Sequence, residues 1–172
     1  MSLLHHPEDS APDAVEHVLE LLRDFDTATL VTRAPDDRLH GRPMALASVE
    51  KDGTVWFVTD RTSQKAAEIA EDPRALIVLQ SSRRFLTANG ATVLVKNQQK
   101  LHELWKDTYK LWFEDENDPN IVLLKFTPVD AEYWDTSGAR GLKYAFRAAK
   151  AYLSGETAKK EEDPEIHGKV NG

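Results

Sequence analysis

Two short segments carry the side chains best suited to chemistry, and both suit the binding of an anion. The first is 40–44, His-Gly-Arg-Pro-Met, in which the guanidinium of Arg42 offers a fork of donors that fits a phosphate. The second is 57–65, which is typical of a strand, a loop and the first turn of a helix, with Ser63 and Lys65 in that turn. Unpaired backbone N–H groups, a hydroxyl and an ammonium there predict an anion site.

The same residues also fit an ordinary protein surface. Arg42 alone fits an exposed strand position, Ser63 a helix cap and Lys65 a solvated side chain. The pattern leaves both interpretations open. The sequence has no Gly-x-Ser-x-Gly, His-Glu-x-x-His or P-loop motif, and its six scattered histidines predict no metal site.

Composition narrows the class of protein. The absence of cysteine excludes a disulfide framework, a thiolate metal site and a cysteine nucleophile, and it fits a reducing compartment. The formal net charge of -7 disfavours nucleic acid as a partner. No apolar run approaches the ~20 residues that span a bilayer, and no secretory signal is visible, so we expect a cytoplasmic protein without a transmembrane segment.

The spacing of apolar residues predicts six or seven strands and four helices, a mainly β pattern typical of an antiparallel barrel with appended helices. Gly90 is expected to mark a bulge or kink. The expected strands are 28–32, 42–49, 55–59, 75–79, 85–95, 121–126 and 131–134, with Pro128 separating the last two. The expected helices are one that begins at 10–13 and reaches Phe25, then 63–70, one marked by Leu101 to Thr108, and 142–154.

One folded domain is expected between two less ordered ends. Residues 1–10 are predicted to be a flexible N-terminus, 11–155 the barrel domain, and 156–172 a disordered charged tail. The basic stretch 140–150 has two interpretations: a solvated helix face, or a surface for an acidic partner or an anionic membrane.

An ordered set of motifs runs from about Asp24 to Gly155. It resembles the pyridoxamine 5'-phosphate oxidase-like, FMN-binding split β-barrels, and within them the general stress protein branch. The motifs are Arg42-Pro43-Met44, Trp56-Phe57-Val58-Thr59, Ser63-Gln64-Lys65, Ile69, Asp72-Pro73, Gly90, Leu104-Trp105, Trp112-Phe113, Asp118-Pro119, Glu132-Tyr133-Trp134-Asp135 and Leu153-Ser154-Gly155.

The resemblance implies a homodimer with two FMN sites at the subunit interface. Arg42 and Lys65 would bind the flavin phosphate, with Ser63 beside them. Gln64 stands where the true oxidases usually have an arginine, which removes one positive charge from that cluster.

The rest of the flavin also has expected neighbours under the resemblance. The backbone of Pro43 and Met44, together with Val58 and Thr59, would line the isoalloxazine ring and the ribityl chain. Trp112 would approach the flavin of the partner subunit, or would be a core or interface aromatic residue.

Two departures separate this chain from the true oxidases. Ala47 replaces a lysine near flavin and substrate, and no Arg-x-His element follows Trp134. The resemblance therefore implies an FMN-dependent oxidoreductase that uses reduced nicotinamide and a redox substrate other than pyridoxamine phosphate, with His40 as the candidate acid or base. The alternatives are a stress-response module that binds FMN without turnover, a binder of haem (with His40 as axial ligand) or deazaflavin, and an empty barrel used for protein contacts.

Overall fold

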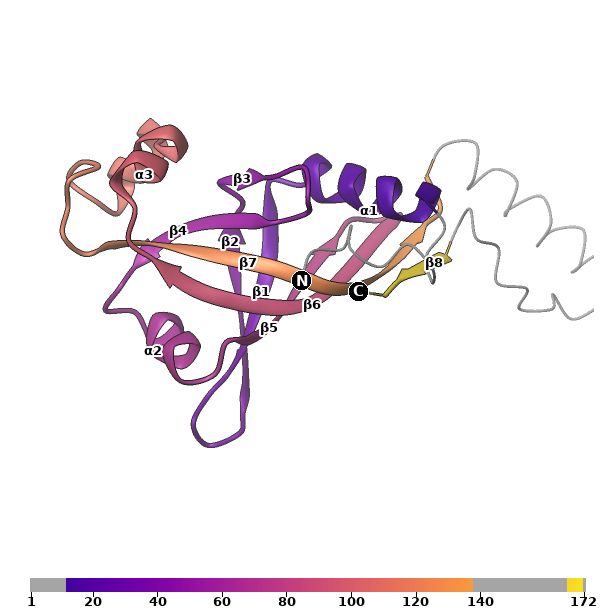
Figure 1. The fold of residues 1–172 in the computed structure, drawn as a ribbon, viewed down its shortest axis with the longest axis horizontal. Coiled ribbons are helices and arrows are strands. Elements are labelled where there is room, and N and C mark those ends of the chain that lie inside the picture. The colour runs from indigo at the N-terminus through magenta and orange to yellow at the C-terminus, as the bar shows by residue number, and fades with distance from the viewer. Residues whose placement is uncertain (1–11, 138–166, 172) are drawn as a thin grey trace, which may run out of the picture.

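An antiparallel sheet of eight strands forms the body of the protein (Figure 1). The structure is a computed structural model, and it describes residues 12–137 and 167–171. Its elements are α1 (Pro12–Asp24), β1 (Thr27–Arg33), β2 (Leu39–Ala45), β3 (Ser48–Val49), β4 (Val55–Asp60), α2 (Gln64–Glu71), β5 (Arg74–Gln80), β6 (Arg84–Val95), α3 (Gln98–Leu104), the short 3-10 helix η1 (Asp107–Leu111), β7 (Ile121–Asp135) and β8 (His167–Val170).

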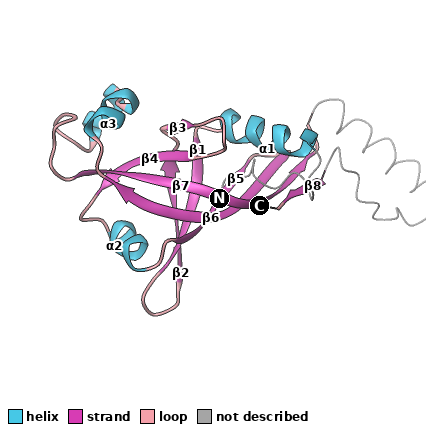
Figure 2. Ribbon diagram, in the orientation of Figure 1, coloured by secondary structure: helices cyan, strands magenta, loops and turns pink. Residues whose placement is uncertain are grey.

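The sheet curls into a half-barrel. The strand order is β2-β1-β5-β6-β7-β4-β3, with β8 added beside β7, and every pair is antiparallel. β2 and β4 contact each other although they are not neighbours in this order. The helices of the described residues lie around the rim of the strands, as Figure 2 shows. The predicted antiparallel split barrel is confirmed.

Two apolar clusters hold the fold together. The larger one fills the half-barrel, where Phe57 and Phe126 are fully buried, and α1 packs Val18 and Leu22 against it. The spacing of Val18 and Leu22, one helical turn apart, is the pattern that predicted α1. The smaller cluster lies under α3 and η1, and consists of Trp56, Leu101, Leu104, Tyr109, Phe113, Ile121 and Leu123.

The prediction of two strands around Pro128 is wrong, because β7 is continuous across this residue. Asn89 on β6 pairs with Asp130, but the next residue, Gly90, pairs with Pro128, so β7 has one extra residue at this point. A proline at a bulge removes no regular ladder bond, because the extra residue already interrupts the ladder.

The expected irregularity at Gly90 is confirmed at the same bulge. A Cβ on Gly90 would overlap the carbonyl oxygen of Thr127 and the ring of Phe126. Glycine therefore lets β6 and β7 approach closely at this bulge.

Other element boundaries also differ from the predictions. The expected strand 42–49 is divided into β2 and β3, and β2 begins at Leu39. The helix expected around 101–108 ends at Leu104, since Trp105 has an extended backbone, and η1 then begins. The helix expected at 142–154 lies outside the described residues.

The tail prediction is wrong for four residues, which form β8 on the edge of β7. Val170 is fully buried there, and His167 stacks on Trp134 with 4.8 Å between ring centroids. The Nε2 atom of His167 lies 2.8 Å from a carboxylate oxygen of Glu132. Within the parts of the chain that the structure describes, no helix is both long and apolar enough to cross a membrane.

Candidate anion-binding site

Glu68 is the centre of a polar cluster between α2, β1 and β2. Its side chain is only 3% exposed. One carboxylate oxygen accepts hydrogen bonds from the hydroxyl of Thr32 at 2.5 Å and from Nη2 of Arg42 at 2.9 Å. The other oxygen lies 2.6 Å from Nδ1 of His40. These bonds outweigh the desolvation that opposes ionisation, so the pKa of Glu68 is lowered and the carboxylate is charged at neutral pH.

Strand geometry brings His40 and Arg42 to the same carboxylate. Residues two apart on a strand point to the same face, and α2 packs beside β1, the neighbour of β2. Nη1 of Arg42 donates to the hydroxyl of Thr32 and, at 3.5 Å, to the carbonyl of Leu30. Among the described residues Nε of Arg42 has no hydrogen-bond partner. The Arg42 guanidinium is thus held through Nη1 and Nη2, and its Nε–H can donate to another acceptor.

The first turn of α2 contributes free backbone donors. Ser63 is the N-cap residue, but its hydroxyl donates to the carbonyl of Asp60 at 2.6 Å and makes no capping bond to the helix. Within the described part of the chain, the backbone N–H groups of Gln64 and Lys65 have no acceptor. Two unsatisfied donors at the positive end of a helix favour a negative ligand.

Lys65 is the second cation of the site and is half-buried. Burial lowers its pKa, the nearby positive charge of Arg42 lowers it further, and Asp60 opposes both. The structure therefore brings Arg42 and Lys65 close enough for their charges to repel. Like charges gathered in a partly buried place are typical of a site that receives an opposite charge.

The remaining predicted residues lie on neighbouring elements. Pro43 is exposed on β2, and Met44 is buried in the core. Val58 is half-buried and Thr59 is buried on β4, the strand that leads to α2. Gln64 is exposed, and its side-chain amide lies 3.2 Å from Nδ1 of His40.

Trp112 is not part of this cluster within one chain. It follows η1 and is 70% exposed. Figure 1 shows α3, which precedes η1, and α2 on opposite sides of the end of the sheet. The expectation that Trp112 approaches a flavin of a partner subunit therefore stays a prediction.

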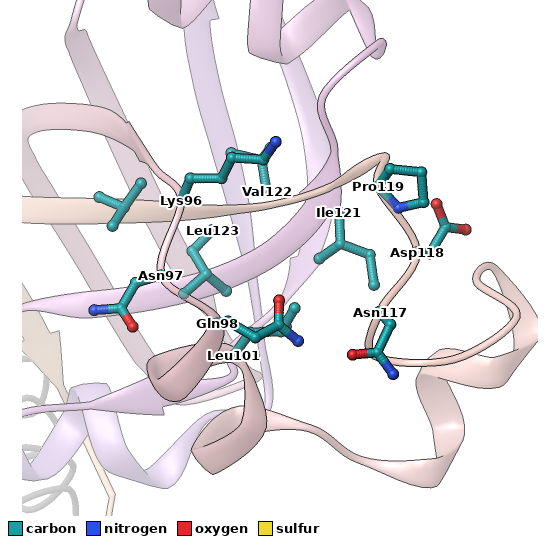
Figure 3. Close-up of a pocket in the computed structure, with 11 residues that line it drawn as sticks. Lys96, Asn97, Gln98, Leu101, Asn117, Asp118, Pro119, Ile121, Val122 and Leu123 are labelled. Atoms are coloured by element: carbon teal, nitrogen blue, oxygen red, sulfur yellow. The ribbon is translucent and has the colours of Figure 1, made fainter.

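A cavity that the sequence did not predict lies beside the start of α3 (Figure 3). Its apolar floor includes Leu101 and Leu123, and its polar rim includes Lys96 and Asn117. None of the predicted phosphate-binding residues lines it. Next to this cavity, the N–H of Arg61, which follows β4, donates to the carbonyl of Asn120 at 2.8 Å.

Sequence reasoning missed Glu68 and Thr32, although each carries a signal. Glu68 lies on the buried face of α2 beside Ala66 and Ile69, where a charged side chain needs partners. Thr32 continues the buried alternation of Ala28 and Leu30 along β1. A polar residue at a core position of each element was the available clue.

The fold defines a class, the split β-barrel, and Arg42 of β2 and the first turn of α2 form a candidate anion site in it. The family model described as "Pyridoxamine 5'-phosphate oxidase like" matches residues 13–159, and the chain belongs to this family.

Three known proteins are similar to this chain in sequence or in fold. General stress protein 26 of Bacillus subtilis (strain 168) is 25% identical over 124 residues, covering 69% of this chain and 86% of the relative. The structure of a candidate general stress protein 26 from Jannaschia sp. CCS1 has a TM-score of 0.73 and 25% identity, covering 94% of this chain and all of that one. A general stress FMN/FAD binding protein from Xanthomonas citri has a TM-score of 0.64 and 23% identity, covering 75% and 93%.

Proposed function

We propose that this protein binds FMN, with the flavin phosphate between Arg42, Lys65 and the first turn of α2. The proposal is supported by the charge of Arg42, which lies near enough to lower the pKa of Lys65, and by two backbone N–H groups at the start of α2 that have no acceptor among the described residues. A dianionic phosphate would relieve the repulsion between the two cations and would accept hydrogen bonds from the two backbone N–H groups. Ser63 lies beside this position, at the N-cap of α2.

The rest of the flavin is proposed to extend from the phosphate along β2 and β4. Pro43 has no N–H to leave unpaired and is exposed, so a planar ring can lie over the backbone of Pro43 and Met44. Val58 and Thr59 would border the ribityl chain from β4. The exposed Trp112 supports a homodimer in which this ring contacts the partner, since a large exposed aromatic side chain is typical of an interface.

We further propose that the protein is a cytoplasmic oxidoreductase that takes electrons from reduced nicotinamide. Flavin itself supplies the redox chemistry when bound, and the protein supplies binding and orientation. The missing lysine at Ala47 supports a substrate other than pyridoxamine phosphate. The second candidate is an FMN-binding module without turnover. It is supported by the ionic contacts of the titratable groups that the structure describes at the site, since Glu68 is bonded both to Arg42 and to His40.

The test begins with the purified protein. Its absorption spectrum and the mass of any released ligand should identify FMN, and added FMN should bind to the empty fraction. Loss of Lys65 in Lys65→Ala should reduce the bound fraction, whereas Lys96→Ala, at the separate cavity of Figure 3, should not. A haem spectrum, or no binding of FMN, would refute the proposal. Steady oxidation of reduced nicotinamide by the FMN-loaded protein would separate an enzyme from a binding module.

A further inference from the structure

His40 and Glu68 form a carboxylate–imidazole pair at the edge of the anion site. Nδ1 of His40 lies 2.6 Å from the carboxylate, Glu68 is buried, and the His40 side chain is 36% exposed. A charged carboxylate only accepts hydrogen bonds, so Nδ1 carries a proton and donates it. The other ring nitrogen, Nε2, has no partner among the described residues and is available to a ligand.

The protonation state of Nε2 decides what it can bind. In the neutral ring Nε2 is an acceptor and repels a phosphate oxygen, whereas in the protonated ring it is a donor with a positive charge. Glu68 also binds Arg42 through its second oxygen. The Glu68 carboxylate is thus bonded to both His40 and Arg42, and each of these side chains keeps a nitrogen that can donate to a phosphate.

We propose that Glu68 is a positioning residue that holds His40 and Arg42 toward the same anion, and that His40 is a third, proton-dependent phosphate-binding group. This inference rests on the proposed binding of FMN and adds a regulation to it: the affinity for the phosphate rises when His40 gains a proton. Riboflavin, which lacks the phosphate, should show no such dependence.

The other charges near His40 act in both directions. Glu68 places a negative charge beside the imidazole, whereas Arg42 on β2 and Lys65 on α2 are positive charges near the same site. A bound phosphate adds negative charge beside Arg42 and Lys65 and would accept a hydrogen bond from a protonated Nε2. The remaining charged side chains of β1, β2 and α2 are Arg33, which is paired with Asp37 and with Asp72, and the exposed Glu71. Asp60, at the end of β4, acts on Lys65.

The experiment measures FMN and riboflavin affinities of the parent and of His40→Gln at about pH 6.5 and about pH 8.5. Phosphate monoesters are mainly dianionic throughout this range, since their second pKa is about 6. The remaining change in phosphate charge affects both proteins equally, so it cancels when they are compared at the same pH. At the lower pH, His40→Gln should bind FMN roughly fivefold more weakly than the parent. At the higher pH, the two proteins should agree within about twofold, because an imidazole without a second proton offers Nε2 only as an acceptor.

Two further variants complete the test. Glu68→Gln should reduce the same pH dependence, because a neutral amide oxygen accepts the Nδ1 hydrogen bond but stabilises a charged imidazole less than a carboxylate does. His102→Gln is the matched control: His102 pairs with Glu116 at 2.7 Å on α3, away from the site, and its loss should leave the parental profile unchanged.

The outcomes separate the inference from the proposed function. If FMN binds better than riboflavin but His40→Gln keeps the parental pH profile, the inference is wrong and the proposed function survives. If the parent binds FMN no better than riboflavin, both are wrong. An equal pH dependence for riboflavin would also contradict a role at the phosphate.

Discussion

Replacing Arg42 by alanine should destabilise the protein as well as weaken FMN binding. Arg42 donates to Glu68 at 2.9 Å, and Glu68 is 3% exposed. The substitution leaves the buried carboxylate without its fully charged partner. Removing one member of a buried ion pair typically costs about 3–5 kcal/mol. Thr32 and His40 still donate to Glu68, so we expect about 3 kcal/mol, the lower end of that range.

Urea unfolding at neutral pH measures this effect. With a urea m-value of about 2 kcal/mol/M, a loss of 3 kcal/mol lowers the unfolding midpoint by roughly 1.5 M. The control is the same substitution in a Glu68→Gln background. No buried charge is then left behind, so Arg42→Ala should cost only about 1 kcal/mol, a typical hydrogen-bond value. An equal cost in both backgrounds, or an unchanged midpoint in Arg42→Ala, would refute the assignment of Glu68 as the buried counter-ion.

Four other predictions follow from the same structure. Lys65→Ala should weaken FMN binding by about 1 kcal/mol or more in a titration but change the urea midpoint little, since Lys65 forms no ion pair with the residues that the structure describes. The pKa of Glu68 is lowered on folding, so its contribution to stability is present above the ordinary glutamate pKa of about 4.3 and is lost as the pH falls below it. The difference in unfolding free energy between the parent and Glu68→Gln should therefore shrink as acid is added. A constant difference would contradict this. Gly90→Ala should destabilise by about 1–3 kcal/mol in urea, because its Cβ would overlap the backbone of β7. Gly168→Ala should release β8, because its Cβ would overlap the ring of Tyr133; amide exchange at 167–170 should become at least about tenfold faster, and unchanged protection would count against the packing.

Local patterns predicted the elements that depend on local periodicity. The buried positions of α1 recur at helical spacing, and those of β1 alternate, so each element is visible in the sequence. That Arg42 and Lys65 bind one phosphate was predicted only through resemblance to a family, and it stays a prediction. From their types alone, both residues fit a solvated surface equally well.

Features that depend on pairing between distant segments were not predictable. Pro128 looks like a strand break until Gly90 is found opposite it at a bulge. β8 was missed because four residues in a charged tail carry little apolar pattern, and they are held by contacts with β7. Glu68 was missed for the same reason: its partners Thr32 and Arg42 are 36 and 26 positions away along the chain.

The measurement that tests the central claim most directly is a crystal structure of the protein with FMN bound. We expect the phosphate to contact the Arg42 guanidinium, the Lys65 ammonium and the backbone N–H groups of the first turn of α2, with Glu68 still bonded to Arg42. A phosphate bound elsewhere, such as beside Lys96 at the cavity of Figure 3, with Arg42 and Lys65 both out of contact, would contradict the account.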